Sequence, residues 1–150
     1  VYAGLRSIDV EGATGLYDTN YEGKARAAIE ALRHEDFVFL HLEASDEAGH
    51  DGDPALKVRT IEYLNDRIVR PVLNEIGSWK EDVSVAVLPD HPTPCAIRTH
   101  TARPVPFTIY RTGGEGDGVT KFDEESAKEG SYGLIAGRQF IETFLGVSGK

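Results

Sequence analysis

The segment Phe37-Val38-Phe39-Leu40-His41-Leu42 is a nearly continuous apolar run, and it largely decides the fold class. Such a run is typical of a central strand in a parallel sheet, because helices cover both faces of a sheet of that kind. The run from Val83 to Leu88 has the same character and ends at Pro89. The two runs therefore predict buried parallel strands at residues 37–42 and 83–88.

Shorter strands are expected at residues 5–10 and 105–110, where Pro106 suits an edge strand or the start of a strand. The alternation of strands with helical patterns predicts an α/β fold, with a mostly parallel sheet and helices on both faces. Capping residues and apolar spacing place the helices from Thr19 or Asn20 to about Arg33, from Asp53-Pro54 to Gly77 with a kink or division at Pro71, and from Leu134 to Leu145.

The composition restricts the kind of protein. At 150 residues, with 40% hydrophobic and 27% charged residues, the chain has the make-up of one globular domain. No apolar run is long enough to cross a bilayer, so no membrane partner is expected. The single cysteine excludes an internal disulfide framework and predicts a cytoplasmic protein. A net charge of −9 argues against nucleic-acid binding, although bound metal cations would let the chain hold an anionic substrate.

Three stretches carry candidate metal ligands. Asp46 and His50 follow the first apolar run, in a loop or the first turn of a helix, where both side chains can face one side. Asp90 and His91 follow the second run, and flanking prolines take the backbone out of the sheet, so that both side chains can reach one pocket. His100 comes nine residues after His91.

Two carboxylates and three imidazoles are ligands that divalent metals take at hydrolytic and phosphoryl-transfer sites. Each stretch alone has a plainer explanation: Asp46 and His50 as a helix cap and a surface histidine, Asp90-His91 as a polar turn, and His100 as a surface residue. All three stretches, however, lie at the carboxyl ends of predicted parallel strands, where open α/β sheets bind ligands. The combination predicts that the five side chains line one pocket and form most of a two-metal site.

Longer motifs surround these residues. They are Gly12-Ala13-Thr14-Gly15 with the segment Asp18 to Lys24, the segment His41 to Asp53, and the segment Asp90 to Pro106. Over essentially the whole chain, these motifs closely resemble the archaeal-type, cofactor-independent phosphoglycerate mutases of the alkaline phosphatase superfamily. The resemblance implies a partial alkaline-phosphatase-like core, with residues 1–150 as the carboxyl-terminal part of the metal-binding domain.

The resemblance also implies roles for the five residues. Asp46, His50 and His100 would bind one divalent metal ion, and Asp90 and His91 would bind a second; manganese, zinc, cobalt and magnesium are the candidates. The family's nucleophilic serine, a further aspartate ligand and an inserted substrate-binding domain have no counterpart here. The chain is therefore expected to contain no catalytic nucleophile. The lack of methionine indicates either a processed start or, in better agreement with the resemblance, a piece of a longer protein.

The implied function of the full-length protein is the interconversion of 3-phosphoglycerate and 2-phosphoglycerate through a phosphoserine intermediate, without bisphosphoglycerate as cofactor. This is an isomerase reaction of glycolysis and gluconeogenesis on a phosphorylated small molecule, and the expected partner of this chain is the remainder of its own protein. The fragment alone is expected to be inactive. Alternatives are a related phosphotransferase such as a proposed homoserine kinase, a phosphatase of the same superfamily, or a metal-binding remnant without activity.

Overall fold

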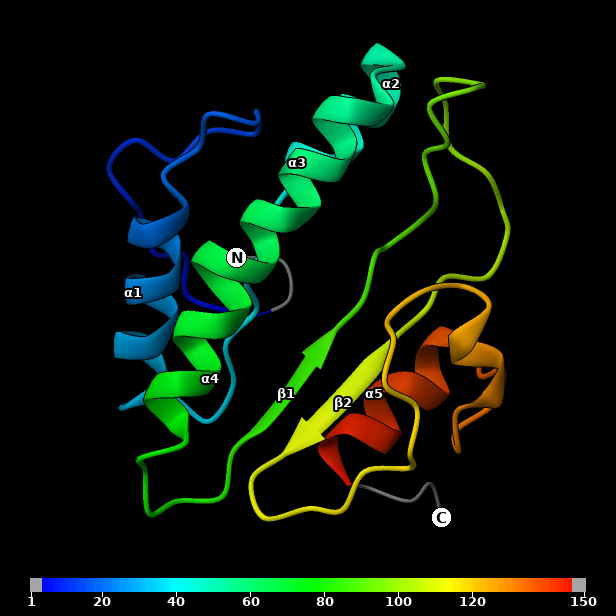
Figure 1. The fold of residues 1–150 in the computed structure, drawn as a ribbon. Helices are drawn as coiled ribbons and strands as arrows, with labels where there is room; N and C mark the ends of the chain where they lie inside the picture. The colour runs from blue at the N-terminus through cyan, green and yellow to red at the C-terminus, as the bar shows by residue number, and fades with distance from the viewer. Residues whose placement is uncertain (1–3, 147–150) are drawn as a thin grey trace. The chain divides into compact units, whose positions relative to one another are not determined.

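A computed structural model of the chain describes residues 4–146. The chain divides into two compact units, and Figure 1 shows the elements of both. Unit 1 comprises residues 1–78 and 93–99, and unit 2 comprises residues 79–92 and 100–150. The chain therefore passes from unit 2 into unit 1 and back again through the segment 93–99.

Unit 1 is built from helices. Tyr21, Ala25, Ala44 and Ile68 form its buried cluster, against which partly buried side chains such as Leu40 pack. No helix within residues 4–146 is long and apolar enough to span a membrane. The helical elements are α1 (Tyr21–Leu32), α2 (Ala44–Asp51), α3 (Pro54–Leu64), the π-helical turn η1 (Asn65–Val69) and α4 (Arg70–Ile76).

The helix caps predicted from the sequence are confirmed. The Asn20 side chain accepts a hydrogen bond from the Gly23 N–H at 2.9 Å and begins α1. Asp53 does the same for the Leu56 N–H at the start of α3, with Pro54 in the first turn.

The expected interruption at Pro71 takes the form of the π-helical turn η1. Proline has no N–H to donate within a helix, and the hydrogen bonding changes just before it. The Arg70 N–H reaches five residues back to the Asn65 carbonyl, as in a π-helix. Gly77 then ends α4, as predicted. In consequence α3, η1 and α4 run on as consecutive helical elements without an intervening loop (Figure 1).

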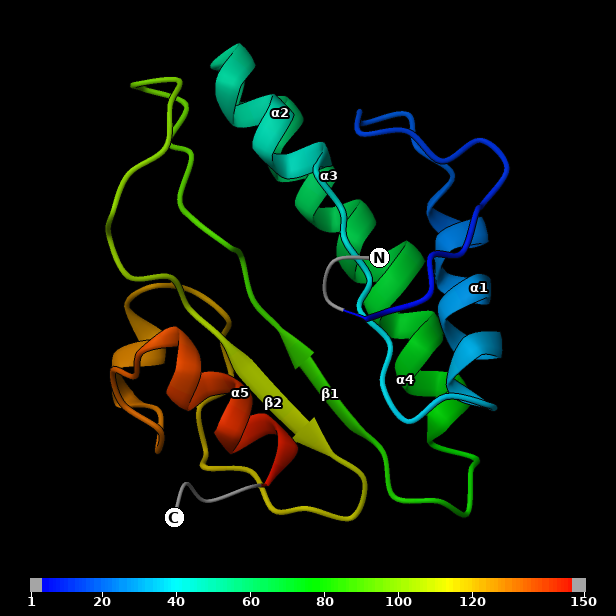
Figure 2. The same cartoon turned by 180° about the vertical axis from the view of Figure 1, so that it is seen from behind.

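Unit 2 contains a two-stranded ribbon and a helix. Strands β1 (Ser84–Val87) and β2 (Thr108–Arg111) are antiparallel, with Ser84 opposite Arg111. Helix α5 (Gly137–Leu145) covers the face of the ribbon turned toward the viewer in Figure 2. The Phe140 ring packs edge-on against Phe107, with ring centroids 5.4 Å apart. Arg111 Nη2 also donates to the Thr143 carbonyl at 2.9 Å, so β2 holds the last turn of α5. A 3-10 turn, η2 (Ser126–Glu129), precedes α5.

The prediction of a mostly parallel sheet does not match the described residues. The strands expected near 83–88 and 105–110 are present, but residues 4–146 hold only this antiparallel pair as a sheet. Residues 5–10 and 37–42, expected as strands, form no ladder. An apolar run can favour an extended backbone, yet a strand forms only when a neighbouring strand receives its hydrogen bonds. Phe39, in the middle of the deciding run, is 69% exposed.

An ion pair joins α1 to η1. Arg67 donates to both carboxylate oxygens of Glu22, at 2.5 and 2.8 Å. The guanidinium carbon also lies 4.5 Å from the Tyr21 ring centroid and 5.1 Å from that of Tyr63, within the range of a cation–π interaction. The hydrogen bond from Arg67 is the main cause that lowers the pKa of Glu22 to about 2. The π-helical turn thus carries the arginine that ties α1 to the long helical segment.

The pair predicts an acid-sensitive contribution to stability. Because the pKa of Glu22 is lowered in the folded state, its contribution is present above the ordinary glutamate pKa of 4.5 and is lost as the pH falls from about 4.5 toward about 2. The Glu22 side chain is 52% exposed, so solvent screening limits the contribution to at most about 1 kcal/mol. In urea unfolding experiments, Glu22→Gln should be less stable than the wild type at pH 7, and the difference should vanish near pH 2.

Glu125→Gln is the matched control, because it removes a surface carboxylate that pairs with Lys128 within a single turn of chain. A difference between wild type and Glu22→Gln that stays constant from pH 7 to pH 2 would contradict the role of this ion pair.

Candidate metal centre

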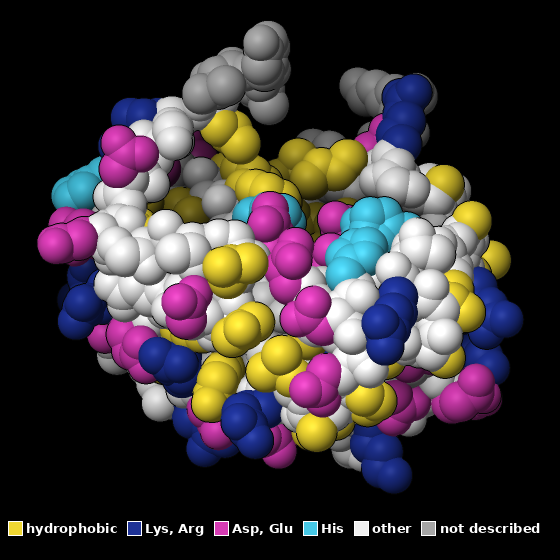
Figure 3. Space-filling view, turned by 90° about the horizontal axis from the view of Figure 1, so that it is seen from above, with side chains coloured by type: hydrophobic (Ala, Val, Ile, Leu, Met, Phe, Trp, Pro, Cys, Tyr) yellow, Lys and Arg dark blue, Asp and Glu magenta, His cyan; other side chains and the backbone are white. Residues whose placement is uncertain are grey.

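Helix α2 presents Asp46 and His50 together. The two residues are four apart, so they lie on the same face of the helix one turn from each other. Ala44 and Ala48 lie on the opposite face and are fully buried, which leaves the acidic and imidazole side chains partly open to solvent. Figure 3 shows histidine side chains reaching the molecular surface. Of the two arrangements expected for this stretch, a loop or the first turn of a helix, the structure shows a helix, with His50 in its last turn.

The Asp46 carboxylate and the His50 imidazole lie next to each other. His50 Nε2 lies 3.2 Å from Asp46 Oδ2. His50 Nδ1 lies 3.0 Å from the Arg98 carbonyl oxygen. A carbonyl oxygen only accepts hydrogen bonds, so Nδ1 carries the hydrogen, and in the neutral imidazole Nε2 carries a lone pair. A lone pair and a carboxylate oxygen at this distance repel each other unless a proton or a cation lies between them.

The orientation of the Arg98 carbonyl has a local cause. Among residues 4–146, Arg98 is the one non-glycine residue with a positive φ, at 53°. This left-handed backbone costs roughly 1–2 kcal/mol for a residue with a side chain. Gly52, which ends α2 with φ of 70°, leaves the space in which the Arg98 side chain lies. The strained residue therefore supplies the hydrogen-bond acceptor that selects the His50 tautomer.

Unit 2 contains a second carboxylate–imidazole pair, formed by the adjacent residues Asp90 and His91. The His91 backbone N–H donates to Asp90 Oδ1 at 3.0 Å, and His91 Nε2 lies 3.3 Å from Asp90 Oδ2. The His91 and His100 rings lie with their centroids 3.6 Å apart. The Thr101 N–H donates to the Pro92 carbonyl at 3.0 Å, and this bond closes the intervening loop. The structure thus brings His91 and His100 together within unit 2, whereas the convergence of all five side chains on one pocket stays a prediction.

The donor atoms fit a divalent metal ion. Two ligands bound at about 2.0–2.2 Å, with tetrahedral or octahedral angles, lie roughly 3.0–3.5 Å apart. The carboxylate–imidazole separations are 3.2 Å in unit 1 and 3.3 Å in unit 2. A metal-binding histidine also commonly donates its second ring N–H to a backbone carbonyl, as His50 does to Arg98. Each unit therefore contains a carboxylate–imidazole pair suited to a metal.

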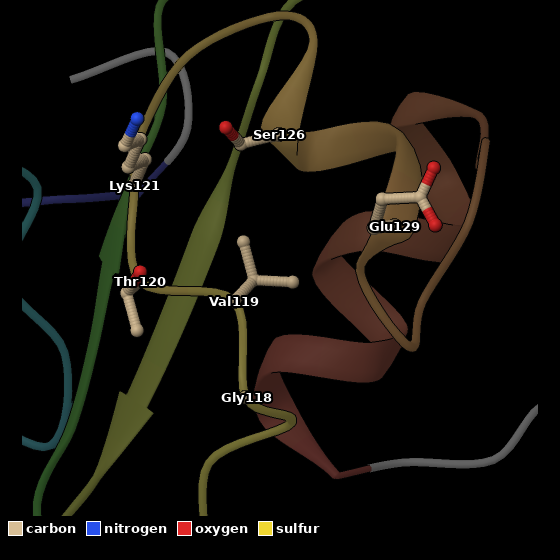
Figure 4. A pocket seen from close by; sticks show the side chains of 6 residues that line it. All are labelled: Gly118, Val119, Thr120, Lys121, Ser126 and Glu129. Carbon is tan, nitrogen blue, oxygen red and sulfur yellow. The ribbon is translucent and has the colours of Figure 1, made fainter.

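The other two histidines of the chain, His34 and His41, make surface contacts with glutamates. His34 lies 3.5 Å from Glu30, and His41 lies 3.6 Å from Glu43, so Glu43 contacts His41. An open hollow in unit 2, shown in Figure 4, contains none of the predicted ligands. The residues that line it are Gly118, Val119, Thr120, Lys121, Ser126 and Glu129.

The sequence analysis missed Thr93. This residue is 3% exposed, and its hydroxyl donates to Asp46 Oδ1. Its carbonyl accepts a hydrogen bond from Lys57 Nζ at 2.6 Å. Gly49 permits this close approach, since a Cβ there would meet the Thr93 carbonyl and would lie 3.0 Å from Thr93 Cγ2. A threonine between two prolines beside the predicted ligand pair was the available signal, but nothing in the spacing indicated a contact with Asp46.

The family model for the Metalloenzyme superfamily matches residues 1–145, which is nearly the whole chain. The chain belongs to the Metalloenzyme superfamily. This membership agrees with the two carboxylate–imidazole pairs and with divalent metal dependence.

Named relatives confirm the resemblance to phosphoglycerate mutases. The chain is 54% identical over 142 residues to the 2,3-bisphosphoglycerate-independent phosphoglycerate mutase of Methanosarcina acetivorans, covering 94% of this chain and 36% of that protein. It is 45% identical over 149 residues to a probable enzyme of the same name from Geobacter sulfurreducens, covering 97% and 36%. The structure of the PH0037 protein from Pyrococcus horikoshii matches with a TM-score of 0.88 and 37% identity, over 98% of this chain and 44% of that chain. The chain spans about a third of the length of the curated relatives that it matches.

The close approach at Gly49 predicts an unusual response to alanine. In an open helix, glycine to alanine stabilises by roughly 0.5–1 kcal/mol. At position 49 the new methyl group would push Thr93 away from α2, so Gly49→Ala should lower the free energy of unfolding by about 1–3 kcal/mol. Gly137→Ala, at the start of α5 with open space around it, should leave stability unchanged or raise it. Equal effects of the two substitutions in chemical denaturation would show that Gly49 does not serve as a spacer.

Proposed function

We propose that the full-length protein is a 2,3-bisphosphoglycerate-independent phosphoglycerate mutase, and that this chain supplies most of its metal ligands. The observation that carries the proposal is the repeated carboxylate–imidazole pair, at 3.2 and 3.3 Å, in a chain 54% identical to an enzyme of that name. Metal-assisted phosphoryl transfer needs ligands of this kind, and the names of the relatives support transfer within phosphoglycerate.

We further propose that the pairs of the two units form one binuclear centre. Chain connectivity supports this. The Thr93 hydroxyl donates a hydrogen bond to Asp46. His91 precedes Thr93 by only two residues, so the Cα atoms of His91 and Thr93 can be no more than about 7 Å apart. Likewise, the Arg98 carbonyl binds His50, and His100 follows Arg98 by two residues. Asp46, His50 and His100 would then hold one metal ion, and Asp90 and His91 would help to hold the other.

The residues of this chain would bind and orient the metals and would not transfer protons themselves. Arg98 keeps the hydrogen on His50 Nδ1 and so leaves Nε2 available to a metal. When bound, the two divalent ions would lower the pKa of a nucleophilic serine and neutralise charge on the transferring phosphoryl group. That serine and the substrate-binding domain would lie in the part of the relatives' length that this chain does not span. Manganese, zinc, cobalt or magnesium would serve, without bisphosphoglycerate, and the reaction would take place in the cytoplasm.

The proposal extends to the sheet. Residues 37–42 would become a strand, and the sheet mostly parallel, when the remainder of the full-length chain supplies neighbouring strands. Leu40 and Leu42 already pack against the buried cluster of unit 1, while Phe39 is exposed and available to a further layer. This would complete the alkaline-phosphatase-like core.

Diffraction from crystals of the full-length protein grown with manganese would test the binuclear centre directly. Anomalous difference maps should show two manganese peaks about 3.5–4 Å apart. One peak should lie within bonding distance of Asp46, His50 and His100, and the other of Asp90 and His91. Two manganese ions, one bound at Asp46 and the other at His91 but much farther apart than this, would contradict the single centre. His34, on the surface beside Glu30, should show no peak and serves as the internal control.

Activity of the full-length protein tests the reaction itself. The wild type should convert 3-phosphoglycerate to 2-phosphoglycerate, whereas His50→Ala and Asp90→Asn should abolish turnover because each removes a metal ligand. Ser45→Ala and the surface control His34→Ala should retain activity, and this chain alone should show none. Phosphorylation of homoserine by ATP, in place of mutase turnover, would show that the protein is instead a related kinase.

A further inference from the structure

We propose that Thr93 is a positioning residue, which fixes the carboxylate of Asp46 for metal binding. The inference rests on the proposed metal centre but not on the mutase reaction. All of the contacts that carry it lie within unit 1, between α2, α3 and the segment 93–99.

The Thr93 hydroxyl determines how the Asp46 carboxylate is presented. An ionised carboxylate only accepts hydrogen bonds, so the hydroxyl donates its hydrogen to Oδ1. Rotation about the last torsion of aspartate is soft and roughly two-fold, so without a partner the two oxygens would exchange places easily. With Oδ1 held by Thr93, Oδ2 is the oxygen that faces His50 Nε2 at 3.2 Å. The hydroxyl therefore assigns one oxygen to the protein and the other to the metal.

Thr93 is itself held in place from two sides. Lys57 Nζ on α3 donates to its carbonyl oxygen at 2.6 Å, and a hydrogen bond from an ammonium group is among the stronger kinds. On α2, Gly49 lets the Thr93 backbone and methyl group lie against the helix. The side chain is 3% exposed, so water cannot readily replace it as the donor to Asp46. Positioning of the ligand thus depends on a rigid and dry contact.

The chain offers a matched comparison for Thr93. Thr60 on α3 is also fully buried, and its hydroxyl also donates a hydrogen bond, to the Lys57 carbonyl at 2.8 Å. Replacing either threonine by valine removes a buried hydroxyl and keeps the shape of the side chain. Only the change at Thr93 removes a donor to the carboxylate of Asp46. A purely structural role would give similar results at the two positions.

The experiment measures manganese affinity by calorimetry on the full-length protein, without substrate. Thr93→Val should weaken binding at the site containing Asp46 by about 10–100-fold, the usual cost of losing a partner that orients a metal ligand. Thr93→Ser keeps the hydroxyl and should restore most of the affinity. Thr60→Val should bind manganese as the wild type does. Lys57→Met, which leaves the Thr93 hydroxyl in place but loosens its carbonyl, should cause a smaller loss than Thr93→Val.

Two results would overturn the inference: unchanged affinity in Thr93→Val, or equal losses in Thr93→Val, Thr93→Ser and Thr60→Val. If Thr93→Val fails to fold, Lys57→Met and Thr93→Ser decide the question, since wild-type affinity in Lys57→Met or a full loss in Thr93→Ser contradicts the positioning role. Turnover of 3-phosphoglycerate is assayed separately. A protein that binds manganese through Thr93-positioned Asp46 but lacks mutase turnover would refute the proposed reaction and leave this inference standing.

Discussion

The docking of the segment 93–99 on helix α2 is the contact on which the ligand geometry of unit 1 depends. The helix alone places Asp46 and His50 on one face, but it does not determine which of their atoms are available. Thr93, at the beginning of the segment, engages one oxygen of Asp46, and the carbonyl of Arg98, near its end, engages Nδ1 of His50. Both candidate ligands are therefore oriented by one short segment, and Gly49 is the residue that allows this segment to come close.

The two carboxylate–imidazole pairs share their geometry but differ in what supports them. The Asp46 carboxylate is held by a side chain 47 residues away and is 28% exposed, whereas the Asp90 carboxylate is held by the adjacent His91 N–H and is 69% exposed. Tertiary contacts fix a ligand before the metal arrives, while a local contact in open solvent leaves more motion to be lost on binding. This difference favours the Asp46 pair as the tighter of the two proposed metal positions.

Features that depend on local chemistry could be predicted from the sequence. Asn20 and Asp53 cap helices because their side chains reach backbone groups three residues ahead, and the placement of Asp46 and His50 on one helix face follows from helical periodicity alone. The lack of a strand at residues 37–42 could not be predicted, because an apolar pattern carries no information on whether a neighbouring strand is present. The contact of Thr93 with Asp46 could not be predicted for a related reason: it joins residues far apart in sequence, and no periodicity encodes such a pair. The candidate ligands themselves stand in local dipeptides and short spacings, which is why the sequence could propose them.

The overall charge of the chain explains why metal ligands and an anionic substrate can belong to one protein. The net charge is −9, and Asp46 and Asp90 add negative charge at the very places where a phosphoryl group would bind. Without cations, these carboxylates would repel a phosphorylated substrate. In the proposed binuclear centre, divalent ions would reverse the sign of the local field and would allow phosphoryl oxygens to bind beside the carboxylates and imidazoles. In the proposed function, the same acidic side chains that give the chain its negative charge would hold the cations that attract a small phosphate ester.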